Sequence, residues 1–312
     1  MTGPAVSVVV PTRDRFAMLT ESGLPSAARQ VGVDVEVIVV DDGSDQETAS
    51  RLQALTDDSV RVLRHDRPRG VAAARNTGIA AARADWIAFL DDDDLWSPHK
   101  LATQLDALAL AGASFAYCGV VVLDDHGTPT EIMTPPRPAD VRAELLRRNS
   151  LPAGSSNVLA ETRLVREVGG FDERLSYLAD WDLWLKLAFS GVPASCDDVL
   201  VGYVRHTRRM HIGGRAASAE LERLRETHGA AGFRPDHGRL LGWLAAEHRR
   251  AGRRSRALGV YACAALAGRD LRPLPRMAAT LVDWRGDGLR QLVSRRTTGD
   301  PGLARPDWLD GR

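Results

Sequence analysis

Short runs of β-branched residues, each ended by proline or aspartate, constrain the fold of this chain most strongly. Val6 to Val10 is a continuous apolar run stopped by Pro11, and Val35 to Val40 is a nearly continuous run stopped by Asp41. Such runs are typical of strands buried on both faces of a parallel sheet. Further strands are expected at residues 60–63, 86–90 and 115–123. Because longer helical patterns separate these runs, the sequence predicts an α/β fold with a mostly parallel sheet flanked by helices.

Several helix boundaries are also marked in the sequence. Ser44 to Glu47 fits a capping box, which predicts a helix with Ser44 as its N-cap. Ser97 followed by Pro98 predicts another N-cap, with proline at the first helical position. The pair Gly169-Gly170 is typical of a helix C-terminus. Helices are therefore expected to begin after Ser44 and after Ser97, and to lie near residues 70–83, 139–148, 162–168 and 180–189, with several shorter ones after residue 206.

Length and charge limit the organisation of the chain. The 312 residues carry 41 basic and 41 acidic side chains, but the charge is unevenly distributed. Residues 1–125 hold 11 basic and 19 acidic side chains, whereas residues 206–312 hold 21 and 11. No apolar stretch approaches the ~20 residues that span a bilayer, and the N-terminus lacks the pattern of a secretory signal, so we expect a cytoplasmic protein. The three widely spaced cysteines predict neither a disulfide framework nor a thiolate zinc site.

Polar clusters follow three of the expected strands, at residues 11–14, 41–44 and 91–94. The carboxyl ends of parallel strands meet at one edge of the sheet, so these clusters should form one cleft. A dinucleotide-dependent dehydrogenase would need G-x-G-x-x-G after the first strand, but residues 11–16 read Pro-Thr-Arg-Asp-Arg-Phe. That loop also lacks the phosphate-binding P-loop pattern, so both classes are excluded.

Four consecutive aspartates, Asp91 to Asp94, are the most unusual feature of these clusters. Repulsion among adjacent carboxylates is costly unless the run is solvated or neutralised by a cation. Oxygen ligands suit Mg²⁺ or Mn²⁺, and Mg²⁺ commonly completes its shell with water and substrate phosphates. Because the run lies between a buried strand and a helix start, we favour metal binding over a solvated acidic loop.

Four segments of the chain, in order, resemble the motifs of the family 2 glycosyltransferases. They read VSVVVPTRDR, VEVIVVDDGS, GVAAARNTGIAAARADWIAFLDDDDLWSP and GGFDERLSYLADWDLWLKLA, within residues 5–206. The resemblance implies a Rossmann-like GT-A fold and an inverting enzyme that uses a nucleotide-sugar donor with Mn²⁺ or Mg²⁺. It implies a glycosyltransferase domain at 1–206, with a donor half at about 1–125 and an acceptor half at about 126–206. Residues 207–312 are then a basic, helical C-terminal extension.

The resemblance assigns donor-binding roles to particular residues of this chain. It implies that Pro11, Thr12 and Arg13 line the nucleotide pocket, that Asp42 contacts the base, and that Arg75 approaches the nucleotide or diphosphate. The DxD motif of the family falls on residues 91–93. Asp92 then faces the ribose, and Asp91 and Asp93 are metal ligands, with Asp93 the most direct. Because relatives commonly read Asp-Ser-Asp-Asp here, the frame of the motif is ambiguous by one residue.

The candidate catalytic base is Asp180, in the segment Leu-Ala-Asp-Trp-Asp at residues 178–182. The corresponding family segment reads Glu-Asp-x-Asp with its second acid as the base, so Ala179 here replaces the first acid. Asp182 could instead serve on the acceptor side or brace the helix. Trp181 is either a packing residue or a stacking face for a sugar.

Two further positions carry open alternatives. Asp172, in the family loop Gly-Gly-Phe-Asp-Glu, could reach the acceptor or donor sugar or be purely structural. His206 follows the last expected core strand, where a histidine of many relatives meets the metal or diphosphate, but a lone histidine is also a common surface residue. The arginine-rich tail after residue 205 could contact anionic membrane or form the solvated face of short helices.

Together these features predict a metal-dependent inverting glycosyltransferase that transfers a sugar, from a UDP-sugar by preference, to an acceptor hydroxyl. Cell-envelope polysaccharide, glycolipid or natural-product glycosylation are the expected settings. The alternative is a non-catalytic sugar-nucleotide-binding or scaffold protein of the same fold, which Ala179 slightly favours. A nucleotidyltransferase would need a glycine-rich, basic first loop, which is absent, and no motif supports nucleic-acid binding.

Overall fold

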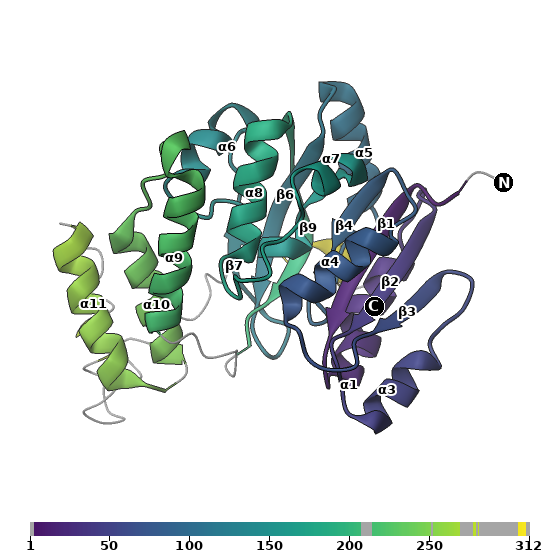
Figure 1. The fold of residues 1–312 in the computed structure, drawn as a ribbon, viewed down its shortest axis with the longest axis horizontal. Coiled ribbons are helices and arrows are strands. Elements are labelled where there is room, and N and C mark those ends of the chain that lie inside the picture. Colours follow the sequence, from purple (N-terminus) through teal and green to yellow (C-terminus); the bar gives the residue numbers. More distant parts are fainter. Residues whose placement is uncertain are drawn as a thin grey trace.

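The computed structural model describes residues 3–206, 214–250, 252–268, 277–278, 280 and 305–309. Its centre is a nine-stranded sheet in which the strand order is β3-β2-β1-β4-β8-β6-β9-β5, with β7 paired to β6 (Figure 1). The strands are β1 (Val6–Thr12), β2 (Val35–Asp41), β3 (Val60–Arg64), β4 (Trp86–Phe89), β5 (Leu95–Trp96), β6 (Phe115–Leu123), β7 (Pro129–Met133), β8 (Leu159–Glu161) and β9 (Pro193–Val204).

The strands expected from the sequence are confirmed, and the sheet is mixed, because β5, β7 and β8 pair antiparallel with their neighbours. β1 pairs in parallel with β2 and β4, β2 pairs in parallel with β3, and β6 pairs in parallel with β9. The short strand β8 lies antiparallel between β4 and β6. β8 thus joins the first half of the sheet to the second. It has only three residues, and they show no distinctive sequence pattern.

Helices cover both faces of the sheet because alternate strand residues point to opposite sides. Val9 and Ile38 pack on the face covered by α4 (Val71–Ala81), α6 (Pro138–Leu145), α7 (Thr162–Glu167) and α8 (Ala179–Ser190). Val8 and Val37 pack on the opposite face, with α2 (Leu24–Ala28), α3 (Gln46–Gln53) and α5 (Lys100–Ala111). The chain between β1 and α2 contains the short helix α1 (Phe16–Met18) and the π-helical turn η1 (Leu19–Gly23). The continuous apolar strands therefore serve two cores.

Two of the predicted helix caps are wrong. The N-cap of α3 is Asp45, whose carboxylate accepts a hydrogen bond from the Thr48 amide, while the Ser44 hydroxyl accepts one from the amide of Asp14 in a neighbouring loop. The helix after Ser97 begins two residues late, with His99 as the N-cap of α5. By contrast, Gly169 and Gly170 both adopt positive φ and end α7 as expected.

The apolar core continues beyond residue 206. Leu221 and Leu224, on α9 (Gly214–His228), and Phe233, which follows η3 (Gly229–Ala231), belong to the same cluster of buried residues as α8. The next two helices, α10 (His237–Arg250) and α11 (Arg254–Gly268), form a helical hairpin at the outer edge of the molecule (Figure 1). Near the C-terminus, η5 (Asp307–Leu309) packs against β9 through Trp308, whose indole N–H donates to the Val199 carbonyl at 2.8 Å.

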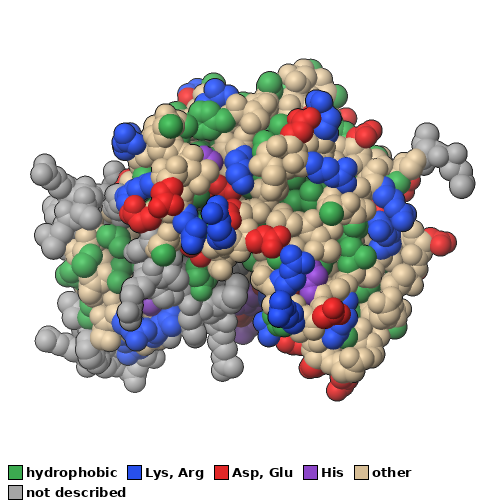
Figure 2. Space-filling view, in the orientation of Figure 1, with side chains coloured by type: hydrophobic (Ala, Val, Ile, Leu, Met, Phe, Trp, Pro, Cys, Tyr) green, Lys and Arg blue, Asp and Glu red, His purple; other side chains and the backbone are tan. Residues whose placement is uncertain are grey.

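The predicted contact of the arginine-rich tail with a membrane can be compared with only part of the surface, because the structure does not describe the whole tail. Among the described residues, none of the helices combines the length and the apolar character needed to cross a bilayer. Over the described part of the face in Figure 2, acidic and basic side chains are interspersed. Arg208, Arg209, Arg295 and Arg296, which are part of the arginine-rich tail, lie outside the described residues. Peripheral membrane contact therefore stays a prediction.

Candidate functional site

The polar clusters meet at the carboxyl edge of the first four parallel strands, as the sequence predicts. Thr12 is paired in register with Asp41, and the Asp42 amide donates to the Thr12 carbonyl at 2.9 Å. The next strand along, β4, ends at Phe89, and the four aspartates follow after Leu90. The loops after β1, β2 and β4 therefore border one site.

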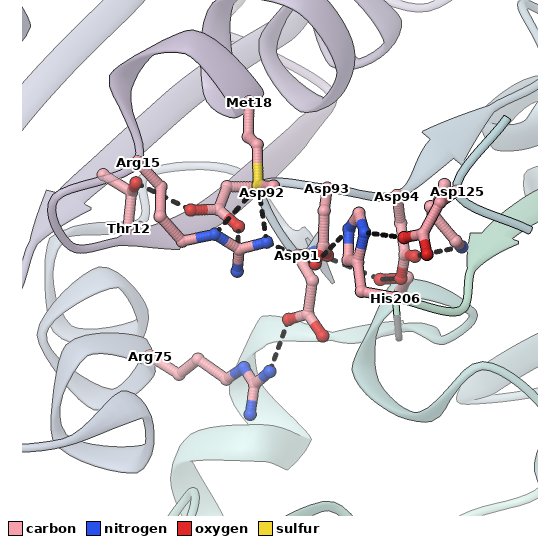
Figure 3. A network of polar contacts seen from close by, with 12 residues as sticks. Thr12, Arg15, Met18, Arg75, Asp91, Asp92, Asp93, Asp94, Asp125 and His206 are labelled. Atoms are coloured by element: carbon pink, nitrogen blue, oxygen red, sulfur yellow. Dashed lines mark hydrogen bonds and ion pairs between the residues drawn. The ribbon is translucent and has the colours of Figure 1, made fainter. Parts of the chain in front are cut away.

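Asp92 is the central acid of this site. It is 3% exposed, and its carboxylate accepts a hydrogen bond from the Thr12 hydroxyl at 2.8 Å. The Arg15 guanidinium bridges Asp92 at 2.8 Å and Asp93 at 2.5 Å (Figure 3). Burial raises the pKa of Asp92 to about 7, against the opposing charge of Arg15. The single guanidinium of Arg15 therefore holds the adjacent carboxylates of Asp92 and Asp93 close together.

His206 completes a chain of polar contacts on the other side of Asp93. Its Nε2 atom lies 3.2 Å from Asp93 Oδ2, and its Nδ1 atom lies 2.9 Å from Asp125 Oδ1 (Figure 3). The interaction with Asp93 raises the pKa of His206, while burial opposes the shift. The fold thus brings together two residues that are more than a hundred positions apart in the sequence, and His206 lies beside Asp93, the expected metal ligand.

Asp91 faces a different partner. Its carboxylate pairs at 2.5 Å with Arg75, which α4 presents and which is 6% exposed. The Arg75 guanidinium also lies over the ring of Phe171, 5.2 Å from the centroid. This places the predicted diphosphate-binding arginine beside the DxD motif and on the side of the site that leads to α8 (Figure 3).

Asp94 is fully buried and has a structural role. One carboxylate oxygen accepts from the Ser156 hydroxyl at 2.6 Å, and the other accepts from the Val204 amide at 3.0 Å. Ser156 in turn accepts from the Asp91 amide at 3.1 Å. Since Asp94 joins η2 (Gly154–Ser156) to the end of β9, the frame in which residues 91–93 form the DxD motif is favoured.

The donor set at this site suits a hard divalent cation. Carboxylate oxygens with one imidazole nitrogen are ligands that Mg²⁺ or Mn²⁺ accepts, and Asp93 and His206 already face each other at 3.2 Å. Arg15 and His206 now neutralise the acids that a cation would share. Within the described residues, no three His, Cys, Asp or Glu side chains are grouped as a ready metal site. Metal binding by Asp91, Asp93 and His206 therefore stays a prediction that the donor chemistry fits.

Asp42 lies at the end of β2, where the nucleotide base is expected. Its carboxylate is 6% exposed and accepts three hydrogen bonds, each 2.8 Å long, from the amides of Arg69 and Gly70 and from Nδ1 of His65. The other ring nitrogen of His65 lies 2.8 Å from the Thr77 hydroxyl. Four acceptor positions are available on a carboxylate, so one remains for a ligand N–H.

Of the other predicted pocket residues, Pro11 is buried within β1, while the Arg13 side chain is 54% exposed and pairs with Asp14 at 3.6 Å. Asp14 has φ 52°, which turns the chain so that Arg13 faces solvent and Arg15 faces the acids. The structure thus brings Thr12 and Arg15 to the aspartates. Arg13, which was expected to line the nucleotide pocket with Pro11 and Thr12, faces solvent, and its role stays a prediction.

Asp180 lies in the first turn of α8, close to these acids. Its Oδ1 accepts from the Trp181 amide at 2.7 Å and its Oδ2 accepts from the Asn149 side chain at 3.1 Å. Burial raises the pKa of Asp180, opposed by the Trp181 amide and the charge of Arg75. A Cβ atom added at Gly154, where φ is +50°, would lie 2.9 Å from Asp180 Oδ2. A raised pKa and a glycine-lined approach suit a general base.

The side chains of the acceptor-side candidates have other partners in the structure. Asp182 is 2% exposed and pairs with Lys186 at 2.6 Å and with His228 at 2.8 Å, so it braces α8. Trp181 is buried, and its indole N–H donates to the Leu145 carbonyl at 2.7 Å, in agreement with the packing alternative. Asp172 forms a bidentate pair with Arg174, and these hydrogen bonds lower the pKa of the Asp172 carboxyl.

Sequence reasoning missed Arg15, Asn149, Gly154 and Asp125. Arg15 carried a signal, because a second arginine follows Arg13 in the motif, but only the turn at Asp14 decides which one faces inward. Asn149 and Gly154 lie in a segment without regular periodicity, and no pattern in the sequence distinguished them.

The fold and the site define a class. A GT-A-type sheet, with the acids after its fourth strand facing an arginine and a half-buried aspartate on a helix, is the architecture of the GT-A-type glycosyltransferases. Among solved structures, TarS of S. aureus in complex with UDP-GlcNAc has a TM-score of 0.57 over 89% of this chain and 88% of that one, at 17% identity. At that identity the likeness concerns the fold.

Sequence comparisons name the family. Residues 7–161 match the model of Glycosyl transferase family 2, which identifies this segment as a domain of that family. It is 35% identical over 195 residues to the succinoglycan biosynthesis protein ExoO of Rhizobium meliloti, covering 59% of this chain and 56% of that protein. It is 27% identical over 130 residues to the Escherichia coli UDP-Glc:alpha-D-GlcNAc-diphosphoundecaprenol beta-1,3-glucosyltransferase WfgD, covering 42% and 51%. The chain thus spans little more than half the length of these relatives.

Proposed function

We propose that this protein transfers a sugar, with inversion, from a nucleoside-diphosphate sugar to an acceptor hydroxyl. The observation that supports this most directly is the position of Arg75. Its guanidinium pairs with Asp91 of the DxD motif, and its charge acts on the half-buried carboxylate of Asp180. The donor-side acids and the candidate base therefore border the same space, as a single displacement requires.

On the donor side, each residue has a distinct task. Asp42 accepts an N–H of the base at its remaining acceptor position, which suits the N3–H of uracil. Arg75 and Arg15 are cationic groups placed to meet the diphosphate, and Thr12 keeps Asp92 oriented toward the ribose. Diphosphate binding would draw Arg15 away from Asp92 and Asp93, since phosphate oxygens compete for the same guanidinium.

Asp91, Asp93 and His206 would hold a Mn²⁺ or Mg²⁺ ion, which as a Lewis acid would offset the charge that develops on the leaving diphosphate. For that role, His206 must be neutral at Nε2, and Asp125 holds the opposite nitrogen Nδ1 at 2.9 Å.

On the acceptor side, Asp180 removes the proton from the attacking hydroxyl. Asn149 orients Oδ2 through a 3.1 Å hydrogen bond, and Gly154 leaves room for the hydroxyl to approach the same oxygen. The raised pKa makes the carboxylate a stronger base than an exposed aspartate. Because one displacement needs one base, no enzymic nucleophile is required.

The relatives suggest the substrates. WfgD is named for a UDP-glucose donor and a lipid-diphosphate-linked acceptor, and ExoO for the biosynthesis of the polysaccharide succinoglycan. TarS was solved with UDP-GlcNAc and with UDP. We therefore propose a UDP-sugar donor and a cell-envelope or lipid-linked glycan acceptor for this chain, acting at the cytoplasmic face of the membrane.

The donor can be tested first, by thermal shift with UDP-, GDP- and dTDP-sugars in the presence and absence of Mn²⁺. We expect a UDP-sugar to stabilise the wild-type protein, more strongly with the metal. Asp93→Ala should abolish the metal-dependent part of the shift. An exposed acid on β9 offers a matched control, and Asp197→Ala should leave the shift unchanged. If no nucleotide sugar stabilises the wild type, the proposal fails.

The base can be tested separately. Asp180→Asn should retain donor binding and lose about 10²- to 10⁴-fold in turnover, the usual contribution of a general base. Turnover equal to that of the wild type would displace Asp180 from this role. Donor binding by the wild type without turnover, over a broad acceptor panel, would instead support the non-catalytic binding protein that the replacement of the first family acid by Ala179 allows.

A further inference from the structure

Glu220, on α9, caps the start of the helix that carries Asp180. Its Oε1 accepts a hydrogen bond from the Ser176 amide, and its Oε2 accepts from the amides of Tyr177 and Leu178, all at 2.9 Å. The carboxylate is 6% exposed, so these contacts form away from bulk water. The first amides of a helix lack intrahelical partners, and a carboxylate there is stabilising.

This cap replaces one that the local sequence lacks. Leu178 is the N-cap residue of α8, and no side chain of the N-cap position makes a capping hydrogen bond. Asp180 accepts from the Trp181 amide. The amides of Ser176, Tyr177 and the N-cap Leu178, which lead into α8, are therefore satisfied by a residue more than forty positions later in the chain.

A second contact joins the same two helices. His228, at the end of α9, lies 2.8 Å from Asp182, one turn into α8 from the cap. Apolar side chains fill the space between, where Leu221 and Leu224 share the buried cluster of α8, and Phe233 packs edge-on against Trp181 at 5.2 Å. The two helices lie side by side in Figure 1. Both polar attachments thus flank Asp180.

We propose that α9 is part of the catalytic unit and that Glu220 is a positioning residue for Asp180. This rests on the proposed function, in which Asp180 is the base. The extension beyond residue 206 then fixes the direction of the Asp180 carboxylate, while the donor site, built on β1, β2 and β4, does not depend on it. Loss of the cap should lower turnover and leave donor affinity unchanged.

The test compares Glu220→Gln with the wild type in two measurements. Hydrogen exchange by mass spectrometry on peptides covering residues 174–182 should show lost protection of the amides at 176–178, because one amide oxygen cannot replace two carboxylate oxygens. Hydrolysis of UDP-glucose and UDP-GlcNAc, with water as the acceptor, should fall about tenfold to a hundredfold in kcat, as expected for a misplaced base. The donor Kd should stay at the wild-type value.

Glu222→Gln is the matched control, since Glu222 lies on the same helix, is exposed and pairs with Arg225; it should change none of these quantities. If Glu220→Gln does not fold, Glu220→Asp keeps the charge but is too short to reach all three amides, and it should show the same pattern. Wild-type kcat in the folded variant would overturn the positioning role and leave the proposed function standing. A wild type that hydrolyses neither donor would overturn the proposed function and, with it, this role.

Discussion

Lys100, at the start of α5, is a cation inside the core. Its side chain is fully buried, its Nζ donates to Gln104 Oε1 at 2.7 Å, and it lies over the ring of Trp96, 4.0 Å from the centroid. Of the residues that the structure describes, no carboxylate lies within ion-pair distance of it. Burial lowers the pKa of Lys100 from its usual 10.5 to about 8.

This shift sets the size of the predicted effect. The difference between 10.5 and about 8 corresponds to about 3 kcal/mol of folding free energy lost at pH 7, because one pKa unit is worth about 1.4 kcal/mol. Lys100→Met removes the charge and keeps a long apolar side chain. It also leaves Gln104 Oε1 without its donor, which costs ~1–2 kcal/mol. The variant should therefore be more stable than the wild type by about 1–2 kcal/mol at pH 7.

The pH dependence gives the sharper result. The unfolded chain binds a proton at Lys100 between pH 8 and 10.5 that the folded protein has already released. The wild type should therefore gain stability, relative to Lys100→Met, as the pH rises through this window, and the gain should be complete above it. Urea denaturation of both proteins at a series of pH values from 7 to about 10.5 measures the difference directly.

The other lysine of the chain is the control. Lys186 pairs with the buried Asp182 at 2.6 Å, so Lys186→Met should lower the stability, because it leaves a buried carboxylate with one partner fewer. The reasoning is refuted if Lys100→Met is less stable than the wild type at pH 7 and the difference does not change with pH.

Three further outcomes follow from the same contacts. Gly154→Ala places a methyl group 2.9 Å from Asp180 Oδ2 at a residue with φ +50°, so kcat should fall while donor Kd, measured by thermal shift, is retained; wild-type kcat would contradict the crowding. Because burial raises the pKa of Asp180 above 3.8, turnover should decline as the pH falls through a value higher than that, and a pH–rate profile that stays flat down to pH 4 would argue against it as the base. Gly78→Ala brings a methyl group 2.2 Å from Val9 Cγ1 and should destabilise the fold by ~1–3 kcal/mol in urea denaturation. Gly242→Ala adds a methyl group that meets no atom within 4 Å in the part of the chain that the structure describes, so it should cost nothing; equal losses in the two variants would refute the packing argument.

Much of the donor half could be predicted because its information is local. The β-branched runs before Pro11 and Asp41 bury on both faces wherever a parallel sheet forms, and the acids that end them must then meet at one edge. The predicted capping box at Ser44 is wrong because of a tertiary contact. The Ser44 hydroxyl accepts a hydrogen bond from the Asp14 amide of another loop, and Asp45 is the N-cap of α3 instead.

The acceptor half resisted prediction because its contacts are long-range. Asp180 stood out through a motif, but its neighbours Asn149 and Gly154 come from an irregular segment whose position only the packed fold defines. We predicted a domain boundary at residue 206 from the extent of the motifs and from the charge distribution. Neither feature of the sequence indicates that α9 shares the core of α8.

By itself, the sequence determined the strands of the donor half, their acidic ends and the type of chemistry they suit, because strand periodicity and carboxylate repulsion act between near neighbours. Only the tertiary structure decided which acid of the four is structural and which arginine faces the acids. It also decided that Glu220 caps the helix of Asp180. Those choices depend on which distant groups satisfy a buried charge or amide, and packing of the whole chain determines that.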